Sequence, residues 1–172
     1  LTQRTDYPWT GKVSISVDIP LSREMTLAIR VPGWARNEAV PGSLYRFAVP
    51  DASPIALIVN GETISDDVNG EGYILINRVW KAGDVVSVDF PMPVRQILAS
   101  DSVANYRGRQ CIQRGPLVYT AEWPDNEGKV RNLLVDKEAA FSLVNLPEIA
   151  DGVTGLAGQA TALSLDATGN VE

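Results

Sequence analysis

The feature that most constrains this chain is an alternation of apolar and polar residues with a period of two. In "KVSISVDI", residues 12–19, every second residue is apolar, and "MTLAIRV", residues 25–31, repeats the pattern. "YILINRVW" and "VVSVDFPM", within residues 73–92, continue it. Such alternation indicates strands with one buried and one solvent-facing side. We therefore predict an all-β fold of antiparallel β-sandwich or jelly-roll modules.

Turn signals between these runs predict how the strands are joined. Asn60-Gly61 lies between two short extended runs and predicts a hairpin, because both residues tolerate a positive φ. Residues 81–84 predict a turn that pairs the strands on either side, and Pro91 and Pro93 end that pair because proline cannot donate to a ladder.

The chain divides into two predicted modules in tandem. A break around residues 99–105 separates a β-sandwich module, 1–98, from a second β-rich module, 99–172, which we expect to be partial or truncated. A stretch rich in proline and alanine, residues 37–54, forms a long loop whose role is open. The strand candidates of the second module are "RQCIQR", "LVYTAEW", "RNLLVD", "FSLVNL" and "ATALSL".

Charge and hydropathy exclude two classes of partner. The chain has 15 Lys and Arg against 21 Asp and Glu, a net charge of -6, which opposes binding to nucleic acid. No run approaches the roughly 18 apolar residues of a membrane span, so we expect no membrane partner. Because the chain starts at Leu1 rather than methionine, we expect it to be part of a longer protein, periplasmic or extracellular if secreted and otherwise cytoplasmic.

The residue inventory argues against catalysis by this chain. It has no histidine, which excludes Ser-His-Asp and Cys-His systems and histidine-based zinc sites. Its one cysteine, Cys111, lies in a predicted strand, where a free thiol usually packs as a small hydrophobe. Glu122 would need burial and a second carboxylate to act as a general acid. Asp66, Asp67 and Glu71 lack the ligand spacing of a calcium loop and favour an acidic turn. We predict no catalytic residue, metal or cofactor here.

The tryptophans are the best candidates for binding. Trp9, Trp34 and Trp80 lie at or near predicted strand ends, and exposed aromatic rings can stack on the apolar faces of sugars. The alternative is that these rings bury large area and fasten loops to the edges of the sandwich. The sequence leaves both interpretations open.

Five motifs in one order give the chain a family resemblance. Together they resemble the region after the catalytic domain in glycoside hydrolase family 127, the β-L-arabinofuranosidase-like enzymes. The resemblance runs from about Thr5 to Glu122, with a weaker continuation in "LPEIADGVTGLAGQA". The motifs are "TDYPWTGKVSISV", "LAIRVPGWA", "LIVNGE", "GYILINRVWKAGDVVSVDFPMPVR" and "QRGPLVYTAEW".

This resemblance implies an upstream (α/α)6 barrel in which a glutamate and a cysteine cluster on zinc perform the chemistry. No position here matches those motifs, so we expect a non-catalytic accessory region, packed against the barrel of an enzyme acting on plant-type or arabinose-containing glycans. The apolar face that meets the barrel would, without it, also suit a homodimer. Two alternatives remain: a carbohydrate-binding module that takes an oligosaccharide on exposed tryptophan, and a free-standing interaction domain.

Overall fold

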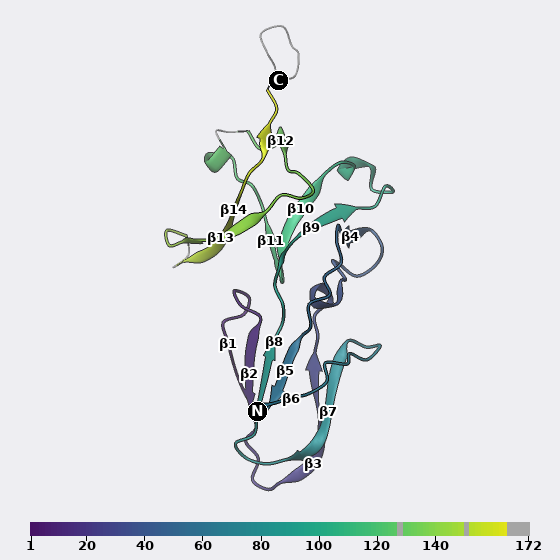
Figure 1. Cartoon of the computed structure of the whole chain (residues 1–172), viewed down its shortest axis with the longest axis vertical. Coiled ribbons are helices and arrows are strands. Elements are labelled where there is room, and N and C mark those ends of the chain that lie inside the picture. Colours follow the sequence, from purple (N-terminus) through teal and green to yellow (C-terminus); the bar gives the residue numbers. More distant parts are fainter. Residues whose placement is uncertain (127–128, 150–151, 165–172) are drawn as a thin grey trace.

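The computed structural model describes residues 1–126, 129–149 and 152–164. Strands dominate these residues, and each helix among them is a 3-10 turn of three or four residues. The molecule is elongated, with two β-rich modules end to end (Figure 1). The prediction of an all-β fold is confirmed. The 3-10 turns are η1 (Gly33–Arg36), η2 (Ala104–Tyr106) and η3 (Pro124–Asn126).

The first module is a sandwich of two antiparallel sheets. Its larger sheet has the order β1-β2-β8-β5-β6, and its smaller sheet pairs β3 with β7. The larger sheet comprises β1 (Thr2–Thr5), β2 (Lys12–Ser16), β8 (Val85–Asp89), β5 (Ala56–Val59) and β6 (Glu62–Thr63), and the smaller one β3 (Arg23–Arg30) and β7 (Tyr73–Trp80).

The alternation in the sequence places one apolar face of each sheet against the other. Within one cluster, Leu57, Val59 and Val86 of the larger sheet and Trp80 of the smaller sheet have no exposed surface. Removing this much apolar surface from water is the main favourable contribution to folding of such a module. The other buried members are Val17, Ile29, Val31, Ile55, Ile74, Ile76, Val88 and Phe90.

The predicted hairpin at Asn60-Gly61 is confirmed, whereas the predicted pairing across residues 81–84 is wrong. Asn60 and Gly61 have φ of 52° and 88° and join β5 to β6. By contrast, β7 pairs with β3, while β8 pairs with β2 and β5. The turn at 81–84 therefore crosses from one sheet to the other. Alternation fixes which face of a strand is buried but not which neighbour it pairs with.

A buried carboxylate, Asp84, ties this crossing turn to the β5–β6 hairpin. Its Oδ2 accepts a hydrogen bond from the Lys81 backbone N–H at 3.0 Å, and its Oδ1 accepts one from the Asn60 side-chain amide at 2.9 Å. The Asn60 side-chain oxygen, Oδ1, in turn accepts from the Val85 N–H at 2.8 Å. The Lys81 and Asn60 hydrogen bonds lower the pKa of Asp84 below its ordinary value of 3.8.

Because its pKa is lower in the folded chain, Asp84 stabilises the fold above its unfolded-state pKa. That stabilisation is lost as the pH falls through the folded-state pKa. We expect Asp84→Asn to unfold at lower urea concentration than the wild type at neutral pH, and the gap to narrow as the pH falls to about 2. Urea titrations followed by circular dichroism measure the gap, with Asp18→Asn as an exposed control. A gap that is the same at both pH values would contradict this account.

The second module is built on a four-stranded antiparallel sheet of order β11-β10-β9-β4. β10 and β11 pair across a turn at Gly115-Pro116, and Gly115 has a φ of 55°, which favours glycine. A Cβ at position 115 would lie 2.9 Å from the Met92 sulfur, so the methionine side chain would have to shift to admit one. The sheet comprises β4 (Tyr45–Phe47), β9 (Val94–Ala99), β10 (Gln110–Arg114) and β11 (Leu117–Tyr119), and two separate pairs are β12 (Leu133–Leu134) with β15 (Thr161–Ala162) and β13 (Phe141–Leu146) with β14 (Val153–Gly158).

The loop at residues 37–54 connects the two modules. It leaves the first module after η1, contributes β4 to the sheet of the second module beside β9, and returns to the sandwich at β5. β9 pairs with β10 as well as with β4, and it starts at Val94, before the boundary that we predict between residues 98 and 99. Of the apolar residues that the structure describes as buried, only Phe47 and Ile97 lie outside the core of the first module.

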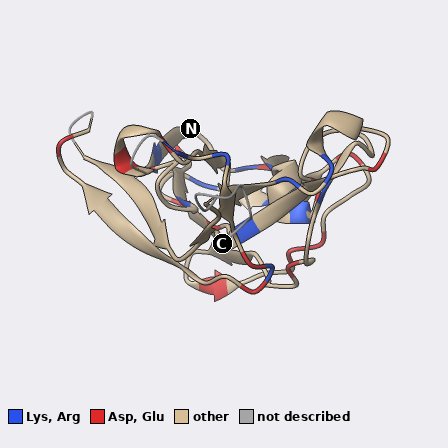
Figure 2. Cartoon of the chain, turned by 90° about the horizontal axis from the view of Figure 1, so that it is seen from above, with Lys and Arg blue, Asp and Glu red and all other residues tan. Residues whose placement is uncertain are grey.

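The surface shows no segregation of charge. Basic and acidic residues are spread around the chain, and neither sign gathers on one side in the view along the long axis (Figure 2). Among the described residues, no helix has the length and apolar character needed to cross a membrane.

Candidate functional site

One face of the larger sheet packs against β3 and β7 in the core of the first module. Among the described residues, no second sheet covers its other face. Strand register aligns Arg4, Ser14, Ser87 and Ile58 in one row across β1, β2, β8 and β5. The side chains along the middle of this row are short, and they leave a depression of about 520 Å³ over the sheet. Small residues at the centre of a strand face allow another element to approach the backbone closely.

A second depression, of about 390 Å³, continues the first toward the junction of the modules. The two share Lys12, Ala56 and Asp89, which form the next row across β2, β8 and β5. The second depression reaches Met92 at the end of the first module and Arg114 of the second module. We call the two together the sheet groove.

Charged side chains of both signs border the sheet groove. Arg4 and Asp6 lie at the β1 end, and Arg114 lies at the end toward the second module. The Arg114 Nη1 donates a hydrogen bond to the Trp9 carbonyl oxygen at 3.0 Å, which fastens the β1–β2 loop to β10. The groove therefore offers hydroxyl, cationic and carboxylate groups beside apolar ones, a composition suited to binding.

Arg95 of β9 is the centre of the module junction. Its Nη2 donates to the Asn37 side-chain oxygen at 2.6 Å and to the Val49 carbonyl at 2.9 Å, and its Nη1 donates to the Trp34 carbonyl at 3.3 Å. The guanidinium carbon lies 3.4 Å from the centre of the Phe47 ring. Burial lowers the pKa of Arg95, and the Asp51 carboxylate partly opposes that change. One side chain thus holds η1, both ends of the 37–54 loop and the second sheet together.

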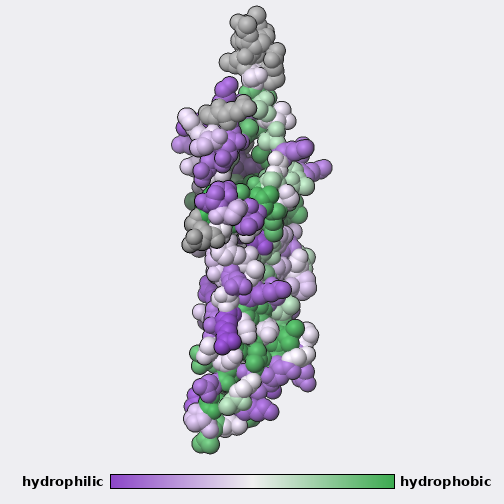
Figure 3. Space-filling view, turned by 90° about the vertical axis from the view of Figure 1, so that its left-hand side faces the viewer, coloured by the Kyte–Doolittle hydropathy of each residue, from purple (hydrophilic) through white to green (hydrophobic). Residues whose placement is uncertain are grey.

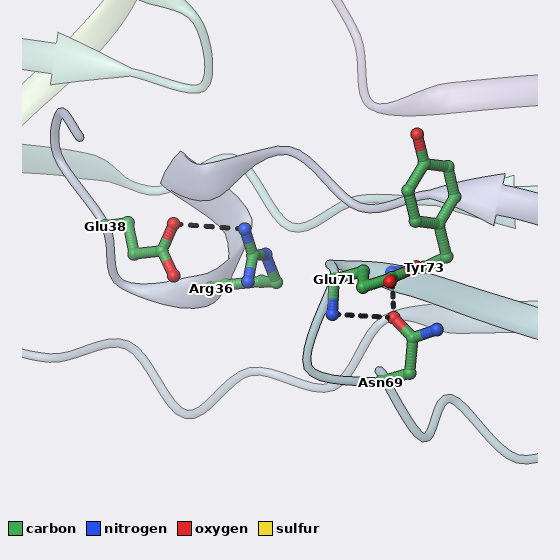
Figure 4. Close-up of polar contacts among 5 residues, drawn as sticks. All are labelled: Arg36, Glu38, Asn69, Glu71 and Tyr73. Atoms are coloured by element: carbon green, nitrogen blue, oxygen red, sulfur yellow. Dashed lines mark hydrogen bonds and ion pairs between the residues drawn. The ribbon is translucent and has the colours of Figure 1, made fainter.

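A polar corner lies where β3 ends and β7 begins (Figure 4). Arg36 and Glu38 form an ion pair at 3.0 Å, and the Asn69 side-chain oxygen accepts from the backbone N–H groups of Glu71 and Tyr73 at 3.0 and 2.9 Å. These contacts shape the turn into β7, and exposed ion pairs of this kind contribute little to stability. The corner serves the local fold.

The structure separates the three predicted tryptophans. Trp80 is fully buried, and its indole N–H donates to the Met25 carbonyl at 3.0 Å, which is the packing alternative of the two interpretations. Trp34 is partly buried against the core and meets Phe90 edge-on, with ring centres 6.0 Å apart. Trp9 is 37% exposed on the β1–β2 loop. Of the three, only Trp9 presents a ring to solvent.

The acid and thiol candidates do not form a reactive pair. Cys111 is half-buried in β10, and burial raises the pKa of its thiol, which disfavours the thiolate. Glu122 is exposed after β11. Asp66 and Asp67 accept hydrogen bonds from the Ile55 N–H and the Ser65 hydroxyl, as residues of a structured turn do. Within the described parts of the chain, no three His, Cys, Asp or Glu side chains gather closely enough to hold a metal ion, so these residues do not fit zinc.

Two domain models cover most of the chain. Residues 1–92 match the β-L-arabinofuranosidase GH127 middle domain, and residues 94–153 match the glycoside hydrolase family 127 C-terminal domain. The chain belongs to glycoside hydrolase family 127. The two models meet at residue 93, where the structure passes from the sandwich to the second sheet.

Relatives within family 127 are similar over nearly the whole chain. A non-reducing end β-L-arabinofuranosidase of Bifidobacterium longum subsp. longum is 30% identical over 99% of this chain. A solved GH127 β-arabinofuranosidase superposes with a TM-score of 0.90 at 38% identity, and a GH127 β-L-arabinofuranosidase of Geobacillus stearothermophilus T6 with 0.81 at 32%, each over 99% of this chain. The chain spans only 21%, 26% and 24% of the length of these three relatives, respectively.

Two features of the site escape sequence reasoning. Nothing local marks Arg95, because its partners come from residues 34–49, far away along the chain. The sheet groove depends on the strand order β1-β2-β8-β5, which brings together four segments that periodicity alone does not order.

Proposed function

We propose that this chain is the non-catalytic accessory β-region of a family 127 glycosidase, packed against the (α/α)6 catalytic barrel that the family resemblance implies. The observation that carries the proposal is the pair of matches to the middle and C-terminal domain models, together with a span of about a quarter of each relative. The substrate class follows from the relatives' names: glycans with β-L-arabinofuranosyl residues.

The residues of the chain agree with an accessory role. Burial raises the pKa of the Cys111 thiol and Glu122 lies in solvent, so these two residues do not form an assembled pair for acyl or glycosyl transfer. Its contribution would be structural: a rigid two-module support for the catalytic part. An oligosaccharide site on this region would depend on Trp9, the one predicted ring that is open to solvent.

The test compares the 172-residue chain with the full-length enzyme that contains it. We expect the full-length enzyme to release L-arabinose from a chromogenic β-L-arabinofuranoside, and the chain alone to release none. Cys111→Ser and Glu122→Gln in the full-length enzyme should leave kcat unchanged. Turnover by the chain alone, or loss of kcat in either variant, would overturn the accessory role. Titration of the chain with arabinose-containing oligosaccharides, beside Trp9→Ala, tests the binding alternative.

A further inference from the structure

We propose that the sheet groove is the surface on which the catalytic part of the same enzyme docks. This inference rests on the proposed function and identifies the surface through which it operates. The partner would insert an apolar element over Ala56 and Ile58, with a carboxylate near Arg4 or Lys12 and a cation near Asp89. The relatives are about four times longer than this chain, so most of such an enzyme lies outside it.

The composition of the groove differs from that of a sheet face made for water. A solvent-facing strand usually carries long polar or charged side chains. Along the middle of the groove the outward positions are instead Ser14, Ser87, Ala56 and Ile58. Lys12 and Asp89 cross the groove in the row that its two depressions share, while Arg4, Asp6 and Arg114 lie at its ends. Apolar positions beside charged groups that a partner can pair are usual in an interface.

The outward face of β3 and β7 provides the contrast. There Thr26 donates to the Asn77 side chain at 3.3 Å, Asn77 donates to Glu24 at 3.5 Å, and the Arg30 guanidinium lies 5.3 Å from the centre of the Tyr73 ring. These polar residues are paired across the strands with one another, while Leu75 and Val79 of β7 lie exposed on the same face. The groove is the better candidate for a covered surface because it is hollowed and reaches the second module.

The groove also extends over both modules. Its second depression includes Phe90 and Pro91 at the end of the sandwich and Arg114 of the second sheet. One docked partner would therefore contact both modules at once and hold them in one orientation. Apolar side chains also come to the surface between polar ones on the β1 and β2 side of the molecule (Figure 3).

Thiol labelling tests the docking surface. In a Cys111→Ser background, single cysteines are introduced as Ala56→Cys and Ser87→Cys in the groove and as Asn77→Cys on the outward face of β7. Serine and alanine to cysteine are small changes, and Ser87→Cys keeps the experiment valid if the exposed Ala56 site perturbs the strand. Each variant is treated with a maleimide, both as the 172-residue chain and as the full-length enzyme, and labelling at the introduced cysteine is read by mass spectrometry of the peptide that contains it.

We expect both groove cysteines to react in the chain alone and to lose their labelling in the full-length enzyme, while Asn77→Cys reacts equally in both. Labelling of the groove in a full-length enzyme whose parts resist separation by limited proteolysis would overturn the docking surface and leave the accessory role standing. Protection of Asn77→Cys instead would move the contact to β3 and β7 and overturn the inference. Protection of the groove cysteines in the chain alone at high concentration would indicate that a second copy of the chain occupies the groove, and this result would also overturn the inference.

Discussion

Replacing Trp80 with alanine is expected to lower the free energy of unfolding by about 3 to 5 kcal/mol, the range for deleting a fully buried aromatic side chain. Trp80 has no exposed surface, and it lies at the end of β7 within the core between the two sheets. The substitution also leaves the Met25 carbonyl without the indole donor. Urea denaturation followed by far-ultraviolet circular dichroism measures the loss.

Two further variants separate the contributions. Trp80→Phe keeps most of the packing but removes the indole N–H. We expect it to lower the free energy of unfolding by about 1 to 3 kcal/mol, because the Met25 carbonyl loses its partner and the ring is smaller. Trp123→Ala removes a ring that is 61% exposed and should change stability by less than about 0.5 kcal/mol. A Trp80→Ala loss as small as that of Trp123→Ala would show that the sandwich core does not depend on this ring.

Arg95→Ala is expected to lower the free energy of unfolding by about 1 to 3 kcal/mol, because the Asn37, Val49 and Trp34 oxygens lose a charged donor in a partly buried junction. We also expect the two modules to unfold in separate transitions in this variant, while the wild type unfolds in one. Differential scanning calorimetry reports both the stability and the number of transitions.

The matched controls lie close by. Arg95→Lys keeps the positive charge but lacks the planar guanidinium, so we expect its unfolding free energy to lie between those of the wild type and Arg95→Ala. Arg46→Ala removes an exposed arginine from β4 and should leave the melting profile unchanged. A single transition of unaltered temperature in Arg95→Ala would mean that the junction is held without Arg95, by the strand pairing of β4 with β9 and the Arg114–Trp9 hydrogen bond.

The sequence predicts local structure here better than it predicts neighbours. The faces of β2, β3, β7 and β8 follow from their period of two, and Asn60-Gly61 and Gly115 mark hairpins because each needs a backbone that few residues adopt. The partner of β8 does not follow, since its alternation suits a hairpin with β7 as well as the observed pairing with β2 and β5.

Short strands and burial of single residues lie beyond local patterns. With three residues, β4 has too little periodicity to stand out within the 37–54 loop. β9 starts at Val94, directly after Pro91 and Pro93. Because these prolines predict the end of a strand pair, the sequence pattern does not indicate that a new strand begins there. Trp34 and Trp80 both lie near strand boundaries, and their different burial depends on the position of the facing sheet. The family resemblance, carried by ordered motifs, compensates for this and is confirmed by the domain models.

The passage of the 37–54 loop into the second sheet has a consequence for the order of folding. During synthesis, residues 45–47 leave the ribosome well before β9, the strand with which they pair. The first sandwich can form before β9 is synthesised, and until then β4 stays unpaired. Pairing between residues so far apart in the sequence slows folding. Cutting the gene at residue 93, where the two domain models meet, would leave Phe47 with neither Ile97 nor Arg95 to cover it. If the two regions matched by separate domain models were expressed separately, each would therefore expose an unpaired strand edge.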